Sequence, residues 1–185
     1  WWGQMARYSY SYQYFGDTKS IDQSLFDAIP ANDIRKSQFF NSPGHGWNLS
    51  PYNKFYHPAK TPRGTGLYTN EDYIYMRVDE MYLLSAEMSA KEGMTTDARN
   101  RLKNLLSLRF DNATDYAYVD ALSGQALADE VYLQTRIELW GEGKSYLAMK
   151  RNKATVTRGS NHLFRTGESF LYNADALTFE IPQSE

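Results

Sequence analysis

Residues 71–93 (EDYIYMRVDEMYLLSAEMSAKEG) and 95–109 (TTDARNRLKNLLSLR) decide the fold. In the first segment, apolar side chains recur at helical spacing along two stripes, which predicts a helix that is buried on two sides. One stripe holds Ile74, Val78, Met81, Tyr82 and Ser85, and the other holds Met76, Leu83, Ala86 and Ala90. We expect Asn70 to cap the start of this helix and Gly93 to end it.

The second segment predicts a shorter helix with a single apolar stripe, formed by Ala98, Leu102, Leu105 and Leu106. Ala86 and Ala98 are small, so the two helices can approach closely as a hairpin. The order of large, small, turn, small and large residues resembles one tetratricopeptide repeat. Because one such repeat cannot bury its faces alone, we expect other helices to cover it.

Composition limits the class of protein. The chain has 185 residues, with 42% apolar and 23% charged residues, which is typical of one globular domain with a hydrophobic core. The net charge of −2 gives no electrostatic basis for binding nucleic acid. Cysteine is absent, which excludes disulfides and thiolate ligands. No apolar run reaches the roughly 20 residues of a membrane span.

The rest of the chain alternates between connections and helices. We expect a short helix with Ile34 and Phe39, capped by Asn32 or Asp33. Residues 41–70 contain four Pro and four Gly and form a long connection, which in compact domains is typically functional or disordered. The remaining expectations are a polar connection at 110–122, helices at 123–140 and 144–151, and a short strand at 177–181.

Four segments, in this order, resemble motifs of the SusD/RagB family of Bacteroidetes surface glycan-binding lipoproteins. They are residues 24–36 (SLFDAIPANDIRK), 73–93 (YIYMRVDEMYLLSAEMSAKEG), 136–151 (RIELWGEGKSYLAMKR) and 179–185 (FEIPQSE). The matching positions include Arg77, Glu80, Leu83, Ala86, Glu87, Arg136, Glu138, Leu139, Glu142, Gly143, Lys150 and Arg151. Ala148 departs from the pattern, because many relatives carry Asp there.

The resemblance implies a mainly α protein of tetratricopeptide-like helical hairpins, packed with long irregular aromatic-rich loops and with little β structure. It implies one C-terminal domain over residues 1–185, divided into a loop-rich aromatic region (1–70), the helices (71–151) and an irregular tail with a short strand (152–185). It also implies capture of oligosaccharides at the outer-membrane surface, beside a TonB-dependent SusC-like transporter, with no catalysis and no cofactor. The chain starts Trp1-Trp2-Gly3 without Met, so we expect the signal peptide and lipid anchor to be absent from this piece.

Aromatic side chains make up 15% of the chain, and those in loops are the candidate ligands for a sugar. Sugar rings stack their C–H faces on Trp and Tyr, while their hydroxyls bind amides and guanidinium groups. The candidates are Trp2, Tyr8, Trp47, Asn48, Tyr52 and Arg63. Trp47 is the strongest, because loops commonly carry binding residues. The alternative is that Trp47 packs its loop against the protein.

Glu138 and Glu142 lie four residues apart on one predicted helix face. Paired carboxylates are the machinery of glycoside hydrolases. Like charges at this spacing also repel each other, so a structural ion-pair network with Arg136 and Arg151 is the preferred interpretation. Two further alternatives to glycan capture stay open: a helical-repeat scaffold for protein–protein interaction, and a hydrolase with both carboxylates exposed in a cleft.

Other charged and titratable residues give no separate site. The three His residues are scattered without a metal-binding spacing, so we expect no metal. Arg35 and Lys36 form a short charge cluster that we expect to lie on a solvated face.

Overall fold

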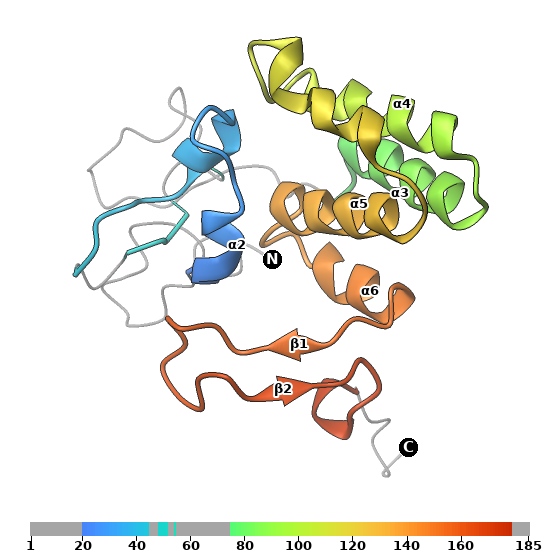
Figure 1. The fold of residues 1–185 in the computed structure, drawn as a ribbon. Coiled ribbons are helices and arrows are strands. Elements are labelled where there is room, and N and C mark those ends of the chain that lie inside the picture. Colours follow the sequence, from blue (N-terminus) through green and yellow to red (C-terminus); the bar gives the residue numbers. More distant parts are fainter. Residues whose placement is uncertain (1–19, 45–47, 52–53, 55–74, 179–185) are drawn as a thin grey trace.

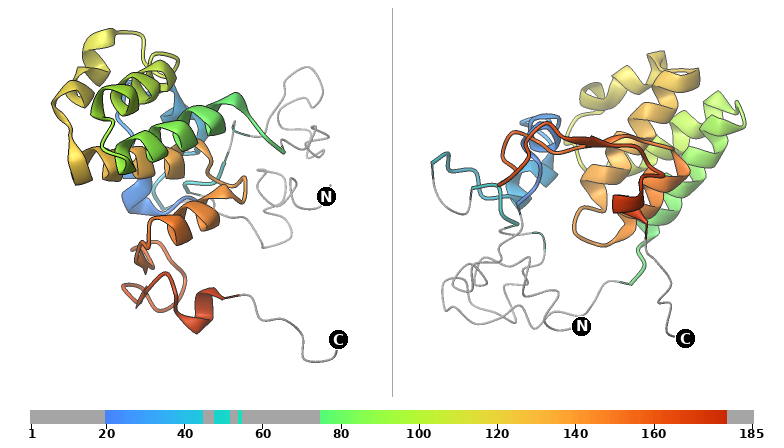
Figure 2. Two further views of the ribbon diagram at one scale, coloured as in Figure 1. Left: turned by 90° about the vertical axis from the view of Figure 1, so that its right-hand side faces the viewer. Right: turned by 90° about the horizontal axis from the view of Figure 1, so that it is seen from below.

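The computed structural model describes residues 20–44, 48–51, 54 and 75–178, which form a helical bundle joined to a smaller N-terminal unit (Figures 1 and 2). With η for a 3-10 helix, the described elements are α2 (Gln23–Asp27), η2 (Ile34–Gln38), α3 (Val78–Lys91), α4 (Thr95–Leu106), η3 (Ala113–Ala121), α5 (Gly124–Glu138), α6 (Lys144–Arg151), β1 (Val156–Thr157), β2 (Ser169–Phe170) and η4 (Asp175–Leu177). The mainly α prediction is confirmed. None of the helices in the described ranges is long and apolar enough to cross a membrane.

Helices α3 and α4 form the predicted antiparallel hairpin (Figure 1). Gly93 adopts a left-handed φ of 74°, as expected for the residue that ends α3. Its N–H donates to the Ala90 carbonyl at 3.2 Å, and the Met94 N–H donates to the Ser89 carbonyl at 2.8 Å. Ala86 and Ala98 are both fully buried between the helices. Small side chains and a tight glycine turn therefore bring the two backbones close together.

The main hydrophobic core lies between this hairpin, α5 and η3. Its buried residues are Leu83, Ala86, Ala98, Leu102, Leu105, Leu106, Phe110, Val119, Leu127, Val131 and Leu139. The predicted stripe of the second helix is thus confirmed.

The polar connection predicted at 110–122 is wrong over most of its length, because residues 113–121 form η3. A 3-10 helix repeats every three residues, so Tyr116, Val119 and Leu122 fall on one side. Val119 is fully buried, and the half-buried Tyr116 and Leu122 pack against the same core.

Helix α3 begins later than the sequence predicts, at Val78 rather than residue 71. Arg77 is extended, with φ −126° and ψ 153°. The predicted cap, Asn70, lies outside the described residues. Helix α3 packs against both α4 and α5, but the predicted stripe through Val78 and Met81 is not buried, since these residues are 71% and 43% exposed. The packed side of α3 is the one that carries Leu83 and Ala86.

Helices α5 and α6 are separated by a turn with two glycines. Gly141 and Gly143 both have a φ of 77°, a left-handed conformation that glycine adopts without steric cost. Helix α5 ends at Glu138, two residues before the predicted end, and α6 has the predicted bounds. The turn lets α6 pack beneath α5 in the view of Figure 1.

The N-terminal unit has a second core, which it shares with α5. Its buried residues are Ile21, Leu25, Phe26, Ile29, Phe39, Leu49 and Ile137, with Leu133 and Trp140 packed against them. The Asp33 side chain caps η2 by accepting a hydrogen bond from the Arg35 N–H at 2.9 Å, so Asp33 is the cap among the two predicted candidates. Since Ile137, Leu133 and Trp140 belong to α5 and the turn after it, the unit is docked on the helical bundle.

The C-terminal segment carries a short antiparallel hairpin in which Val156 of β1 faces Phe170 of β2. The sequence did not indicate these strands. Of the strand predicted at 177–181, Leu177 belongs to η4 instead and residues 179–181 lie outside the described residues.

Candidate functional site

Residues 39–40 and 48–51, which we call the loop base, are held together on the N-terminal unit, at the start of the connection predicted at 41–70. The Phe40 N–H donates to the Ser50 carbonyl at 2.8 Å, and the Leu49 N–H donates to the Phe40 carbonyl at 2.6 Å. Phe39 pairs with Pro51 as an antiparallel bridge. Phe39 is also buried, with its ring 5.2 Å from that of Trp140. These contacts hold the two ends of segment 41–48 together against α5.

Asn48 lies at this base and uses its side chain to close the loop. Its Oδ1 accepts a hydrogen bond from the Ser42 N–H at 2.8 Å, and its carbonyl accepts one from the Ser20 hydroxyl at 3.0 Å. The Asn48 side chain is half-buried. Because Oδ1 is engaged in the loop, the amide NH₂ is the part of this side chain suited to donate to a ligand.

The other five candidate ligands, Trp2, Tyr8, Trp47, Tyr52 and Arg63, lie outside the described residues. Trp47 directly precedes Asn48 in the chain, and Tyr52 directly follows the bridged Pro51.

Glu138, at the end of α5, is surrounded by three guanidinium groups. Arg109 donates through Nε to Oε2 at 2.9 Å and through Nη2 to Oε1 at 2.8 Å. Arg77 donates to Oε1 at 2.9 Å, and Arg35 donates to Oε2 at 3.2 Å. Arg35 itself is held by Asp33 and is only 1% exposed. The carboxylate is thus buried but fully paired, as buried charges must be.

Glu142 extends this cluster to Lys54, which lies within the connection predicted at 41–70. The guanidinium of Arg77 binds it with two hydrogen bonds, of 3.0 and 2.9 Å. The Lys54 ammonium lies 3.1 Å from its Oε1 and donates to the Glu138 carbonyl at 2.6 Å. Burial lowers the pKa of Lys54, and the neighbouring Glu142 opposes that change. We call Arg35, Lys54, Arg77, Arg109, Glu138 and Glu142 the ion-pair hub.

The hub is unsuited to acid–base catalysis. Burial alone would raise the pKa of Glu138, but the hydrogen bonds and charge of Arg109, with the charges of Arg35 and Arg77, lower this pKa to about 2. A general acid in a glycosidase needs a raised pKa. Glu138 and Glu142 are also only 4% and 6% exposed at the side chain, so neither faces an open cleft.

Two cations of the predicted network lie elsewhere, which corrects the sequence prediction. The Arg136 guanidinium lies 5.8 Å from the ring centre of Tyr132. Residues two apart on a helix point to different faces, so Arg136 does not meet Glu138. Arg151 pairs with Glu87 of α3 at 3.0 Å, together with Lys91.

Four hub cations were not assigned to the network from the sequence: Arg35, Lys54, Arg77 and Arg109. The prediction that Arg35 lies on a solvated face is wrong, because Arg35 is buried. Its position two residues after Asp33 is the feature of the sequence that indicates a paired, buried Arg35. This spacing lets one carboxylate cap η2 and hold the guanidinium of the same turn.

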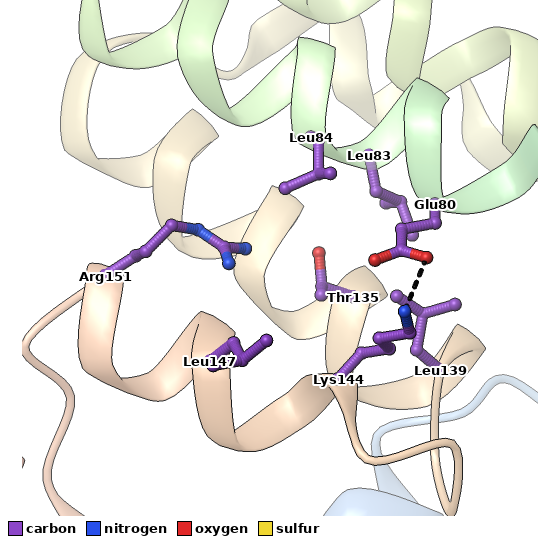
Figure 3. Close-up of a pocket in the computed structure, with 8 residues that line it drawn as sticks. All are labelled: Glu80, Leu83, Leu84, Thr135, Leu139, Lys144, Leu147 and Arg151. Atoms are coloured by element: carbon purple, nitrogen blue, oxygen red, sulfur yellow. Dashed lines mark ion pairs between the residues drawn. The ribbon is translucent and has the colours of Figure 1, made fainter. Parts of the chain in front are cut away.

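A small cavity lies between α3, α5 and α6 (Figure 3). Glu80 and Lys144 form an ion pair of 3.2 Å on one side, and Arg151 lies on the other. Its volume of about 20 Å³ is enough for one water molecule and too small for a sugar ring. The enclosed space of the bundle therefore offers no ligand site at this position.

The described residues form a mainly helical protein with a buried cluster of ion pairs at the end of α5. The family model of the SusD family matches residues 33–183, so the chain belongs to this family. Two solved structures are similar. One is a SusD superfamily protein from Bacteroides fragilis, with 26% identity and a TM-score of 0.60, over 87% of this chain and 33% of that chain. The other is a SusD-like carbohydrate binding protein from Bacteroides vulgatus, with 28% identity and a TM-score of 0.53, over 80% of this chain and 33% of that chain.

The chain spans about a third of the length of these two structures. A search of curated proteins found no match.

Proposed function

We propose that this chain is part of a protein that captures oligosaccharides at the cell surface for import. The observation that carries the proposal is membership of the SusD family, together with a similar structure described as a carbohydrate binding protein. The hydrolase alternative loses its two candidate carboxylates, because Glu138 and Glu142 are buried and paired with cations.

In this proposal the sugar binds at the loop that starts from the Phe39–Pro51 base. Trp47 supplies a flat face for a sugar ring, and Asn48 donates from its amide to a hydroxyl. Trp2, Tyr8, Tyr52 and Arg63 complete the contacts. The hub stabilises the base through Arg35, whose guanidinium bridges from η2 to Glu138 and Gln134 on α5.

The proposed partner is a TonB-dependent SusC-like transporter in the outer membrane, which would receive the captured oligosaccharide. This part rests on the family resemblance. It is tested by purifying the full-length protein from its native membrane under mild detergent. An outer-membrane barrel protein that co-purifies in fixed proportion supports the partnership, and its absence at native expression contradicts it.

The glycan proposal is tested by titrating the full-length protein with plant, host and microbial oligosaccharides while tryptophan fluorescence is recorded. We expect saturation with one glycan class, loss of binding in Trp47→Ala and partial retention in Trp47→Phe. Trp140→Phe is the matched control, because Trp140 packs on Phe39 in the second core. Saturable binding that is equal in Trp47→Ala and the parent would move the site away from this loop. A full panel without response would contradict glycan capture.

A second candidate function is a helical-repeat scaffold for protein–protein interaction, and one observation favours it. Val78, Met81 and Met88 follow each other at helical spacing on α3 and are 71%, 43% and 50% exposed. Exposed apolar groups on one helix face are typical of surfaces that contact another protein. A scaffold would show no response to glycans, and Met81→Glu would reduce the proteins that co-purify with it.

A further inference from the structure

An open groove lies between the C-terminal half of α4 and η3, in the upper part of Figure 1. Its volume is about 480 Å³, within the range of about 300–1,000 Å³ that is typical of small-molecule sites. None of its lining residues belongs to the loop base or to the ion-pair hub. The groove is therefore separate from the site proposed above.

One side of the groove is apolar and held in place. Tyr116 is half-buried, and its ring lies 6.3 Å from that of Phe110 at an angle of 41°. Ala113 and Ala117 lie beside it on η3 and are exposed. Because Val119 of the same 3-10 helix is fully buried, η3 is fixed against α4 and the Tyr116 ring is fixed with it.

The polar groups of the groove are neutral side chains with free hydrogen-bonding capacity. Asn104 and Thr114 are exposed and make no side-chain hydrogen bond within the described part of the chain. Ser107 donates its hydroxyl proton to the Asn104 carbonyl at 2.9 Å, so its oxygen lone pairs remain as acceptors. The groove thus offers amide donors and hydroxyl and amide acceptors beside an aromatic ring.

The charged residues of the groove neutralise each other. Lys103 on α4 binds Asp120 on η3 with a distance of 2.6 Å. Both residues line the groove, so this ion pair leaves no net charge in the lining. A phosphate or a cation would gain little from such a lining, whereas a neutral ligand with both C–H faces and hydroxyl groups matches it.

We propose that the groove between α4 and η3 binds a neutral saccharide unit of one or two rings. The C–H face of the sugar packs on Tyr116 and the two alanine methyls. Its hydroxyls bind Asn104, Ser107 and Thr114. A second saccharide site on the same chain increases the avidity for a long glycan whose ends reach both sites.

The test is a titration of isotopically labelled full chain with single methyl glycosides and disaccharides of neutral sugars, followed by amide NMR. We expect saturable shifts of the Asn104 side-chain amide for at least one sugar. Asn104→Ala should weaken binding about tenfold, as expected when one or two hydrogen bonds are lost. Tyr116→Ala should weaken it further, and Tyr116→Phe should retain it.

Tyr118→Ala is the matched control. Tyr118 belongs to the same 3-10 helix, but its hydroxyl donates to Glu130 on α5 at 2.6 Å and it does not line the groove. Sugar shifts that are absent, or that persist unchanged in Asn104→Ala and Tyr116→Ala, would overturn the proposal. Trp47→Ala should leave this binding intact, so failure of the loop site and failure of the groove are distinguishable.

Discussion

Glu138 is a single residue on which three distant parts of the chain depend. Its carboxylate receives Arg35 from the N-terminal unit, Arg77 from the start of α3 and Arg109 from the segment after α4. An ion pair at this depth gives little net stability compared with apolar packing. The ion pairs instead impose a large free-energy cost on any conformation that leaves one of these buried charges unpaired.

Glu138→Gln should therefore destabilise the protein by about 3 kcal/mol, because it removes the charge while three buried or half-buried cations remain. Urea unfolding at neutral pH measures this change. Glu92→Gln is the control, because Glu92 is exposed at the C-terminus of α3 and a substitution there should change stability by less than about 0.5 kcal/mol. Equal stability of the two variants would show that the hub charges are solvated in solution.

The same residue predicts how stability depends on pH. The pKa of Glu138 is lowered from 4.5 to about 2, because the guanidinium groups outweigh the effect of burial. The unfolded chain then binds more protons than the folded one between these values. The contribution of Glu138, about 3 kcal/mol, is therefore fully present above about pH 5 and is lost as the pH falls towards 2.

This dependence is measured as the difference in unfolding free energy between the parent and Glu138→Gln from pH 7 to pH 2.5. We expect a constant difference above pH 5 and a decreasing one below it. A difference that stays constant to pH 2.5, or that decreases above pH 5, contradicts the lowered pKa.

Sequence reasoning identified the carboxylates of the hub but assigned other cations. Repulsion between Glu138 and Glu142 indicated that cations are near, and residues close in sequence were chosen. Contacts of Glu138 with Arg35 and Arg77 span 103 and 61 positions, so spacing along the chain could not reveal them. The presence of Arg77 in the family motif was the one feature of the sequence that could have indicated Arg77 as a partner of Glu138.

At the scale of elements, the helical hairpin was the most predictable feature. Gly93 and the small residues Ala86 and Ala98 specify a local turn and a close contact, and both are properties of neighbouring residues. The start of α3 was less predictable, because Arg77 leaves the helix to reach α5. Element η3 was missed, since its three-residue repeat differs from the helical and strand periods.

Gly93→Ala should destabilise the hairpin by about 1 kcal/mol, because an L-residue with a Cβ disfavours a φ of 74°. An added Cβ meets no atom within 4 Å, so the cost is one of backbone conformation alone. Gly93→Asn should cost less, since Asn tolerates the left-handed region. Thermal unfolding of the three proteins measures the order, and Asn below Ala in stability would contradict a purely conformational cost.

At the scale of the whole molecule, α5 joins two cores. Leu127 and Val131 pack in the core of the α3–α4 hairpin, whereas Ile137 packs in the core of the N-terminal unit. The sequence predicted both helices of the hairpin and α5, but not that one helix serves two cores. That arrangement depends on long-range packing, which apolar periodicity does not specify.

Arg35 makes polar contacts between the N-terminal unit and α5. It is 1% exposed and donates from η2 to Gln134 at 2.7 Å and to Glu138 at 3.2 Å, both on α5. Arg35→Met keeps a long apolar side chain but removes these bonds. We expect the N-terminal unit to open more often than the hairpin, because local openings follow the weakest junction.

Hydrogen exchange measured by mass spectrometry tests this expectation. In Arg35→Met, peptides with Ile21, Phe40 and Leu49, whose N–H groups are hydrogen-bonded within the unit, should exchange about 10- to 100-fold faster. Peptides from α3 and α4 should change much less. Lys36→Met is the control, because Lys36 donates to the Ile29 carbonyl within the unit rather than across the junction, so exchange at Ile21, Phe40 and Leu49 should change much less than in Arg35→Met. If Arg35→Met accelerates exchange equally in the unit, α3 and α4, then the two cores unfold as one and Arg35 does not couple separate units.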